Sequence, residues 1–298
     1  MNLKDLDLSS VINNIPENLE DMTLSAPKQS KDENIYSISL RKENLTSGTY
    51  KARIRFLPNL ENIKESIIAK INYWLTDANK ENGFYVDSPK SIGEDCPISK
   101  TYFKYKDSTN PVEQRYAEML KMNRQYFSYV QILQDSQHPE LEGRVMIFRY
   151  GTKINEKISE EMNDKDDGGN PFDLMNGREF KIEVKMVGGF QNYDSCKFVG
   201  VRTPVTVDGK VLDANNLKLL EKLYADAPDI KNYKFKPWTA ETTERVYANL
   251  KTYTKGFTPT AIENAMKQET DDDDVKSPVD TKTFDTDETD DFLDGINL

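Results

Sequence analysis

The sequence predicts an α+β protein, mostly β, in which a small five-stranded barrel carries helical and loop insertions between polar ends. Short segments that alternate apolar and polar residues, separated by turn-prone residues, are the first observation behind this prediction. The second is that helical patterns fall between and after these segments. The third is a hydrophobic content of 37%, which fits a folded body diluted by polar ends. Periodicity alone does not separate such a barrel from another α+β sheet.

The clearest predicted strand covers residues 50–56, just before Pro58. Its apolar residues alternate with Lys51, Arg53 and Arg55, so one face should be buried and the other should be basic. The same alternation predicts further strands at 67–75, 83–86, 126–133, 144–150 and 180–187. Helical spacing predicts helices at 112–123, 214–224 and 240–253, of which the last two should cover the barrel.

Three regions follow from composition along the chain. Residues 1–45 are polar and are interrupted by Pro16 and Pro27, which predicts a flexible N-terminal arm. Residues 46–258 form the predicted folded core, with a subdomain at about 62–125. In residues 259–298 most apolar side chains are isolated among acids, so this region should be a disordered acidic tail that binds other proteins.

The negative charge is concentrated in that tail. The chain carries a net charge of -11, and the last thirty residues account for -10 of it, because twelve acids there face only Lys276 and Lys282. Residues 1–268 therefore carry only -1. A basic groove on the body remains compatible with an acidic chain.

Residues 100–129 interleave seven aromatic rings with six cations. Rings can stack on any base and cations can neutralise any phosphate, so this mixture suits single-stranded nucleic acid of any sequence. The alternative, that these rings are ordinary core and the cations ordinary surface, is about equally good on composition alone.

Two shorter segments repeat the mixture. Residues 188–193 place Phe190 and Tyr193 beside two glycines, which let the backbone bend closely, and Arg149–Lys153 combines ring, cation and glycine at a strand end. Both could be stacking loops. A hairpin whose rings fold back onto the barrel explains residues 188–193 about as well.

Enzyme signatures are poor. No nucleotide-binding, nucleophile-elbow or metalloprotease motif is present, and the single histidine, His138, lies beside Pro139 in a segment that predicts a turn. Cys96 and Cys196 are far apart, which excludes a disulfide framework and favours a reducing compartment. No apolar run reaches membrane-spanning length and no signal sequence precedes the body, so we expect a soluble, non-secreted, non-enzymatic protein.

Four stretches in order resemble a known family: Ala52–Pro58, Cys96–Ile98 with the aromatic and basic run after it, Glu142–Gly151 and Gly188–Phe198. Together they are similar to the T-even-type phage single-stranded DNA-binding proteins, the helix-destabilising proteins of the phage replisome. The resemblance implies an OB-fold core with a cleft for single-stranded DNA. It also implies an N-terminal arm for cooperative self-association and an acidic C-terminal region that recruits replication proteins.

The resemblance also implies which residues line the cleft, namely Tyr102, Tyr116, Tyr126, Phe148, Phe190 and Tyr193, helped by Lys121 and Arg124. The cations and rings singled out above add Arg53, Arg55, Tyr150 and Lys153 to the candidate DNA-binding set. In the tail, the apolar residues within the terminal acidic run could form a small face on a partner, so the candidate protein-interaction residues are Asp290, Asp291, Phe292, Leu293, Ile296 and Leu298.

Two departures from the family change these expectations. The family type holds a structural zinc ion through one histidine and three cysteines, and here only Cys96 remains, with Tyr73, Asp87 or Ser88, and Ser99 at or near the other positions. We therefore expect no metal and no cofactor. The basic N-terminal run of the family is replaced by Lys4-Asp5-Leu6-Asp7, which leaves cooperative binding through the arm open.

The expected function is thus that of a sequence-independent protein that coats single-stranded DNA in the cytoplasm of an infected bacterial host. It would destabilise duplex and recruit phage replication, recombination and repair proteins through its tail. A single-stranded RNA-binding translational regulator is the first alternative, since stacking and phosphate contacts do not exclude ribose. A hub that acts mainly through its acidic tail is the second.

Overall fold

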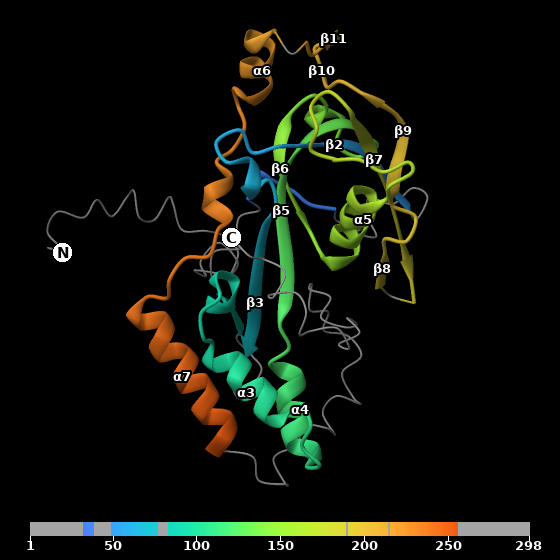
Figure 1. Ribbon diagram of the computed structural model, residues 1–298. Coiled ribbons are helices and arrows are strands. Elements are labelled where there is room, and N and C mark those ends of the chain that lie inside the picture. The colour runs from blue at the N-terminus through green and yellow to red at the C-terminus, as the bar shows by residue number, and fades with distance from the viewer. Residues whose placement is uncertain (1–31, 39–48, 77–82, 189, 214, 256–298) are drawn as a thin grey trace, which may run out of the picture. The chain divides into compact units, whose positions relative to one another are not determined.

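The computed structural model describes residues 32–38, 49–76, 83–188, 190–213 and 215–255 of the chain (Figure 1). The chain divides into two units, residues 1–35 and residues 36–298. The second unit holds nearly all of the described residues. The tail residues 290–298, and with them every predicted protein-interaction residue, lie outside the described residues.

The second unit is built around one large antiparallel sheet. Its central strands run in the order β6-β5-β2-β7-β8, while β3 pairs with both β4 and β5, and β9 pairs with β7. The strands are β2 (Thr49–Leu57), β3 (Ile68–Thr76), β4 (Gly83–Asp87), β5 (Asn123–Asp135), β6 (Val145–Tyr150), β7 (Gly177–Val187), β8 (Phe190–Asn192) and β9 (Lys197–Thr203). A two-residue strand, β1 (Ile35–Tyr36), lies at the unit boundary, and β10 (Thr206–Val207) forms a separate hairpin with β11 (Lys210–Val211).

The α+β class, with strands predominating, is confirmed by this arrangement. The five-stranded barrel is not: within the described ranges no strand pairing closes the sheet on itself. The long strand β5 pairs with three others, β2, β3 and β6, along different parts of its length. It therefore joins two regions that the sequence predicted as barrel and subdomain.

Five α-helices occur among the described residues: α3 (Pro97–Tyr105), α4 (Pro111–Met119), α5 (Thr152–Asn163), α6 (Leu217–Tyr224) and α7 (Ala240–Lys255). Short 3-10 turns cover Ile63–Glu65, Pro89–Ile92, Pro139–Leu141 and Ile230–Tyr233. Proline opens α3 and α4, where its missing N–H costs no hydrogen bond. Asn110 caps α4 by accepting from the Val112 N–H, and Asn216 caps α6 by accepting from the Leu219 N–H.

One core cluster fills the space between the sheet and α5. It contains the inward residues of β2, β5, β6 and β7, such as Ile54, Ile132 and Ile182, together with Ile154 and Ile158 of α5. Five rings surround Phe56 with centroid distances of 5.6 to 6.3 Å. This cluster is the predicted apolar face of the alternating strands.

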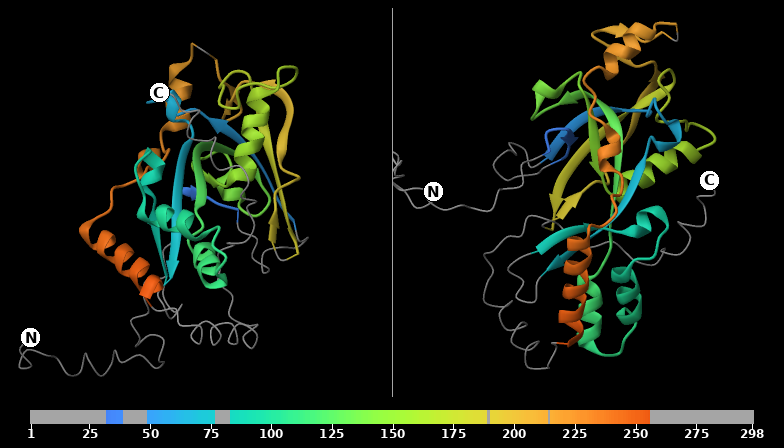
Figure 2. Two further views of the ribbon diagram at one scale, coloured as in Figure 1. Left: turned by 60° about the horizontal axis from the view of Figure 1, so that its bottom comes forward. Right: turned by 90° about the vertical axis from the view of Figure 1, so that its left-hand side faces the viewer.

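A second core cluster lies where β3 and β4 meet α3, α4 and α7. Its buried members include Tyr73 and Leu75 of β3, Leu120 after α4, and Val246 and Leu250 of α7. In both views of Figure 2 these three helices stay together beside β3 and β4. The predicted subdomain at about 62–125 thus has a hydrophobic cluster of its own, although α7 completes it from far along the chain.

The segment from 217 to 255 is attached by side chains that donate to main-chain carbonyls. The Tyr224 hydroxyl donates to the Pro58 carbonyl (2.7 Å), and the Trp238 Nε1–H donates to the Asp87 carbonyl (2.6 Å). Asn249 Nδ2 donates to the Thr76 carbonyl (2.7 Å). These bonds hold the helical C-terminal part of the body on β3, β4 and the end of β2.

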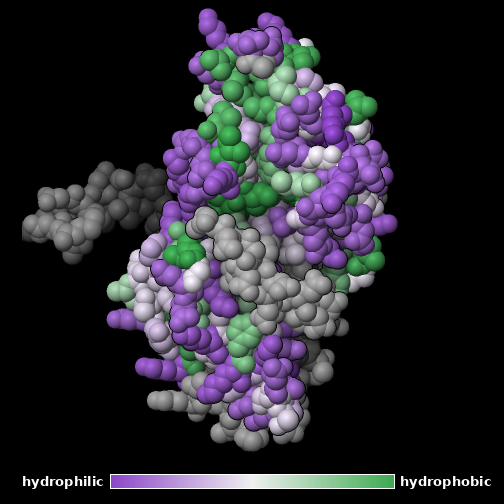
Figure 3. Space-filling model, in the orientation of Figure 1, coloured by the Kyte–Doolittle hydropathy of each residue, from purple (hydrophilic) through white to green (hydrophobic). Residues whose placement is uncertain are grey.

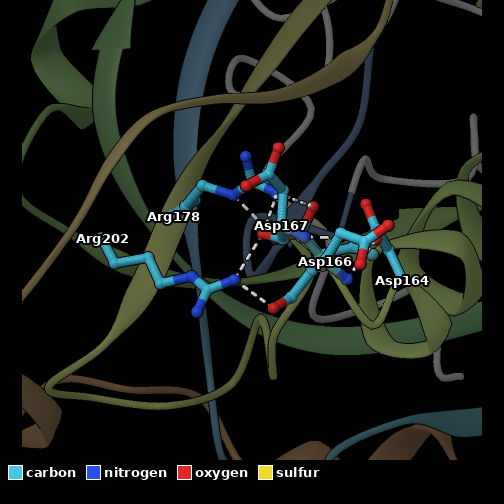
Figure 4. A network of polar contacts seen from close by, with 7 residues as sticks. Asp164, Asp166, Asp167, Arg178 and Arg202 are labelled. Carbon is cyan, nitrogen blue, oxygen red and sulfur yellow. Dashed lines mark hydrogen bonds and ion pairs between the residues drawn. The ribbon is translucent and has the colours of Figure 1, made fainter.

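The loop after α5 is held by two arginines (Figure 4). Arg178 makes a bidentate contact with Glu161, with Nε to Oε1 at 2.7 Å and Nη2 to Oε2 at 2.5 Å, and it also donates to the Asp167 carbonyl. Arg202 donates to the carbonyls of Asp167 and Gly168. The pKa of Asp164 is lowered chiefly because its carboxylate accepts the Asp166 and Asp167 N–H groups.

Tyr36 packs in the first core cluster, although it lies within the stretch 1–45 that the sequence predicts as an arm. Its hydroxyl donates to Asp135 Oδ2 (2.7 Å) and lies 2.9 Å from the Tyr50 hydroxyl. An aromatic residue in a polar stretch carries no periodic signal, so the sequence pattern could not reveal this contact.

Figure 3 shows hydrophobic residues scattered among hydrophilic ones on one face, most densely around α6. The exposed apolar residues near this region are Val211 and Leu217. Within the described ranges, no helix has both the length and the apolar character to cross a membrane.

Candidate nucleic-acid interface

The structure buries four of the predicted stacking rings. Phe148 is 0% exposed, and Tyr126 and Tyr150 stack on each other in the first core cluster, with centroids 5.7 Å apart and planes at 17°. Tyr116 lies in the second core cluster. A buried ring does not offer its face to a base, so in this conformation the four rings, three of them predicted to line the cleft and Tyr150 a further DNA-binding candidate, pack in the core. The strand pairing explains it, since Tyr126 lies opposite Tyr150 on the inward face of the sheet.

Arg55 is also a core residue. It is buried, and its Nη2 donates to the carbonyls of Asp173 (2.5 Å) and Thr203 (3.3 Å). Burial lowers its pKa to about 10, while the charges of Asp173 and Glu179 oppose that shift. The predicted basic face of β2 therefore ends at Arg53, because the chain around Asp173 and Thr203 covers the strand beyond it.

Arg53 stays exposed, but it is engaged by a carboxylate. Its Nη1 lies 2.9 Å from Glu179 Oε2 on the adjacent strand β7. Both side chains are open to solvent, where such a pair contributes little to stability. Arg53 can therefore exchange this partner for a phosphate at small cost.

The β7–β8 hairpin presents the most exposed of the predicted rings. Phe190 is 42% exposed, and Met186 and Val187 beside it are exposed as well. Gly188 has a φ of +59°, a conformation that glycine adopts without strain at the tip of this hairpin. Tyr193 is half-buried against the first core cluster and donates from its hydroxyl to Gln191 Oε1 (2.5 Å). The predicted folding back thus applies to Tyr193 and not to Phe190.

Helix α3 carries a second aromatic and basic surface. Tyr102 is half-buried and meets Phe103 edge to face at 5.2 Å. Phe103 is exposed, and two ammonium groups lie over its ring, Lys90 Nζ at 4.9 Å and Lys106 Nζ at 5.2 Å from the centroid. Lys90 was missed by the sequence analysis, because it lies ten residues before the aromatic run and reaches Phe103 only through the fold.

The remaining predicted cations lie near the junction of β5 and α5. Lys121 and Lys153 are exposed, and Arg124 is half-buried on β5 opposite Ile71. Burial raises the pKa of Tyr126, while the charge of Arg124 and a hydrogen bond from Thr152 oppose that rise. Arg124 and Thr152, at the start of α5, therefore both lie close to Tyr126.

The positions that correspond to the family's zinc ligands come together in the fold. Tyr73, Ser88, Cys96 and Ser99 are all buried, and the Tyr73 hydroxyl lies 2.5 Å from Ser99 Oγ. Burial raises the pKa of Tyr73, and its hydroxyl also interacts with Ser88 and Cys96. A phenol, two aliphatic hydroxyls and one thiol do not match the thiolate and imidazole donors of a structural zinc site, so the residues do not fit the metal. Among the described residues no group of three His, Cys, Asp or Glu side chains could hold a metal ion.

The chain belongs to the gp32 DNA-binding-protein-like family, because the model of that family matches residues 48–252. These residues include the exposed ring of the β7–β8 hairpin and the aromatic and basic surface of α3. The chain is 30% identical over 170 residues to the single-stranded DNA-binding protein of Enterobacteria phage T4, and equally to that of Enterobacteria phage T2. Each alignment covers 54% of this chain and 54% of the relative. The chain thus spans about half the length of the curated relatives that it matches.

Proposed function

We propose that this chain is a non-enzymatic protein that binds single-stranded DNA without regard to sequence. The observation that carries the proposal is the exposure of two aromatic rings on the folded body, Phe190 on the β7–β8 hairpin and Phe103 on α3, with two lysine ammonium groups over the Phe103 ring. Rings stack on bases of any identity and cations neutralise phosphates, which together give sequence-independent binding. The relatives in phages T4 and T2 are named for this activity.

The charge distribution supports the same proposal. Residues 1–268 carry a net charge of only -1, so the cations and acids of this part of the chain nearly balance. A protein that binds open strands and not duplex shifts DNA melting toward the open form by mass action. Duplex destabilisation in an infected bacterial cell is therefore part of the proposal, and so is an OB-type arrangement of the sheet around β2 and β5.

Fluorescence titration of labelled oligo(dT) tests the proposal. We expect tight binding that weakens steeply with salt, because each neutralised phosphate releases counterions. Binding that ignores salt, or that is equally tight for duplex, would refute it. Competition with matched RNA oligomers separates the RNA-binding alternative, since a DNA-specific protein should be displaced much less by RNA.

The β7–β8 hairpin is the first place to probe. Phe190→Ala should weaken oligo(dT) binding by roughly 1 to 3 kcal/mol, because one stacked base loses its ring. Val201→Ala is the matched control, since Val201 is an exposed apolar residue on the neighbouring strand β9. Equal affinities of the two variants would remove Phe190 from the interface.

We also propose that the acidic tail recruits replication, recombination and repair proteins. Deleting residues 269–298 removes ten of the eleven net negative charges, so a strand binder should keep or gain DNA affinity while it loses protein partners. A hub that acts only through its tail would lose its partners and would show no DNA binding in either form.

Cooperative self-association through residues 1–45 is proposed as well. Removing these residues should lower the cooperativity of binding along poly(dT) more than it lowers the affinity for a short oligomer.

A further inference from the structure

The β3–β4 hairpin carries an exposed pair of rings, Trp74 and Tyr85, that neither core cluster includes. We propose that this pair is a base-stacking subsite for single-stranded DNA, additional to the β7–β8 hairpin and the α3 surface. The inference rests on the proposed function and deepens it. Its occupant is an unpaired base of the bound strand, because duplex DNA hides the faces of its bases.

Strand alternation separates these two rings from the core. Tyr73, Leu75 and Val86 belong to the second core cluster. Trp74 lies between Tyr73 and Leu75 on β3, and Tyr85 directly precedes Val86 on β4, so both rings face away from that cluster. The two rings are directly opposite each other across the hairpin, with centroids 4.5 Å apart and planes at 58°. Trp74 is 39% exposed and Tyr85 is 42% exposed. Tryptophan is mostly buried in folded proteins, so an indole with this much exposure is uncommon.

The indole lies against the backbone of Gly83 on the neighbouring strand. Gly83 lies at the start of β4 opposite Thr76, and a Cβ at this position would overlap the six-membered ring of Trp74. The absence of a side chain at Gly83 therefore lets the indole lie close against the hairpin. A ring that is already held loses little conformational freedom when a base stacks on it.

A cation lies within electrostatic reach of the pair. Burial raises the pKa of Tyr85, and the positive charge of Arg149 opposes that rise. Arg149 is exposed at the end of β6 and forms no ion pair with any other described residue. Two rings with a nearby guanidinium are the groups that a nucleotide needs, a stacking surface for the base and a cation for the phosphate.

Tryptophan fluorescence tests the subsite directly, because the chain has only two tryptophans. Trp238 is half-buried, and its Nε1–H donates to the Asp87 carbonyl. In full-length Trp238→Phe protein, oligo(dT) should quench the emission of Trp74. In the reciprocal Trp74→Phe protein, the emission of Trp238 should change little.

Binding is followed at the same time by the anisotropy of a labelled oligo(dT), which separates two kinds of failure. If the oligomer binds and Trp74 emission is unchanged, the subsite is wrong and the proposed function stands. If the wild-type protein does not bind the oligomer at all, the proposed function itself fails.

Affinity measurements add a second, independent test. Trp74→Ala and Tyr85→Ala should each weaken oligo(dT) binding roughly fivefold or more without changing the salt dependence. Arg149→Gln should instead reduce the slope of log affinity against log salt by about 0.7. Tyr247→Ala is the matched control, since Tyr247 is an exposed ring on α7.

Gly83→Ala keeps both rings and displaces the indole, so it should weaken binding as Trp74→Ala does. Circular dichroism verifies that each variant is folded. The competing explanation is that the two rings contact a second copy of the chain. Sedimentation showing that Trp74→Ala abolishes a dimer, with DNA affinity unchanged, would overturn the subsite.

Discussion

Asp135 is a buried carboxylate that gathers four donors. Its Oδ2 accepts from the hydroxyls of Tyr36 and Tyr50, and its Oδ1 accepts from the N–H groups of Gln137 (2.8 Å) and His138 (3.0 Å). A buried carboxylate is tolerated only when its oxygens are satisfied in this way. The group joins the boundary strand β1 to the sheet and to the turn after β5.

Asp135→Asn should therefore lower the free energy of unfolding by about 1 to 3 kcal/mol. In the variant, an amide NH2 group, which only donates, replaces one carboxylate oxygen that accepts two hydrogen bonds. Urea unfolding measures the change. Asp226→Asn, at an exposed position after α6, is the control and should have little effect. Equal stability of the two variants would show that the carboxylate is not the organising group.

Arg55 offers a second prediction at the residue scale. Its guanidinium is buried and reaches only two carbonyls, so its charge is not fully compensated. Arg55→Met should leave the urea midpoint unchanged or raise it, and it should leave the salt dependence of DNA binding unchanged. A fall of about 0.7 in the salt slope would show that Arg55 does contact a phosphate.

The difference between Arg53 and Arg55 also shows what alternation can predict. The period of two correctly identified the apolar residues of β2 that enter the core. It could not reveal that the segment around Asp173, more than a hundred residues later, covers the opposite face. Phe148 and Tyr126 illustrate the same limit, since a ring at a stacking position and a ring in a core have the same sequence signature.

At the scale of elements, the loop after α5 depends on Arg178. Glu161 is nearly buried and Arg178 is mostly so, and breaking such a pair leaves a carboxylate without its partner. Arg178→Gln should cost about 1 to 3 kcal/mol of stability. Trypsin should then cleave faster after Lys165, which lies on this loop. Lys210→Gln, on β11, is the control, and identical cleavage rates in both variants would contradict the role given to Arg178.

The polar cluster around Tyr73 leads to a prediction about metals. Because Ser88, Cys96 and Ser99 each interact with the Tyr73 hydroxyl and the four side chains do not resemble a zinc site, a strong chelator should not shift the melting temperature. Tyr73→Phe should lower that temperature, since it leaves Ser99 Oγ without its partner. A chelator-induced fall, with zinc found in the purified protein by elemental analysis, would contradict the prediction.

Most strands were predictable because each has a buried face with a clear period. Helix α4 was predicted to end at residue 123, but it ends at Met119, and β5 begins at Asn123. Helices α3 and α5 were missed. Only Ile154, Ile158 and Glu161 of α5 are buried, so its polar sequence carries a weak helical signal. The outward face of Trp74 follows from the same period of two, since Trp74 alternates with the buried Tyr73 and Leu75 along β3.

At the scale of the whole molecule, buried tyrosines should make the protein sensitive to alkali. Burial is the largest cause of a raised pKa for Tyr36, Tyr50, Tyr73, Tyr150 and Tyr224. In the unfolded chain these groups ionise near pH 10, and in the folded protein they ionise only above that value. The unfolded state thus releases protons first, so stability is full below about pH 10 and is lost as the pH rises beyond it.

Absorbance of tyrosinate and urea unfolding at several alkaline pH values measure this effect. We expect part of the tyrosine signal to appear only together with unfolding. Tyr150→Phe should flatten the decline, because it removes one buried hydroxyl. If all 15 tyrosines titrated reversibly near pH 10 in the folded protein, the burial of these hydroxyls would be refuted.

The attachment of the segment 217–255 has a consequence for how this protein can change over time. Tyr224, Trp238 and Asn249 each donate to a main-chain carbonyl, and every amino acid carries that group. Residues at the accepting positions can therefore be replaced without losing the bond, provided that the backbone keeps its course. Substitutions are therefore tolerated at the residues whose carbonyls accept these bonds and are constrained at the three residues whose side chains donate them. Distant relatives can share this attachment although the residues at their accepting positions differ.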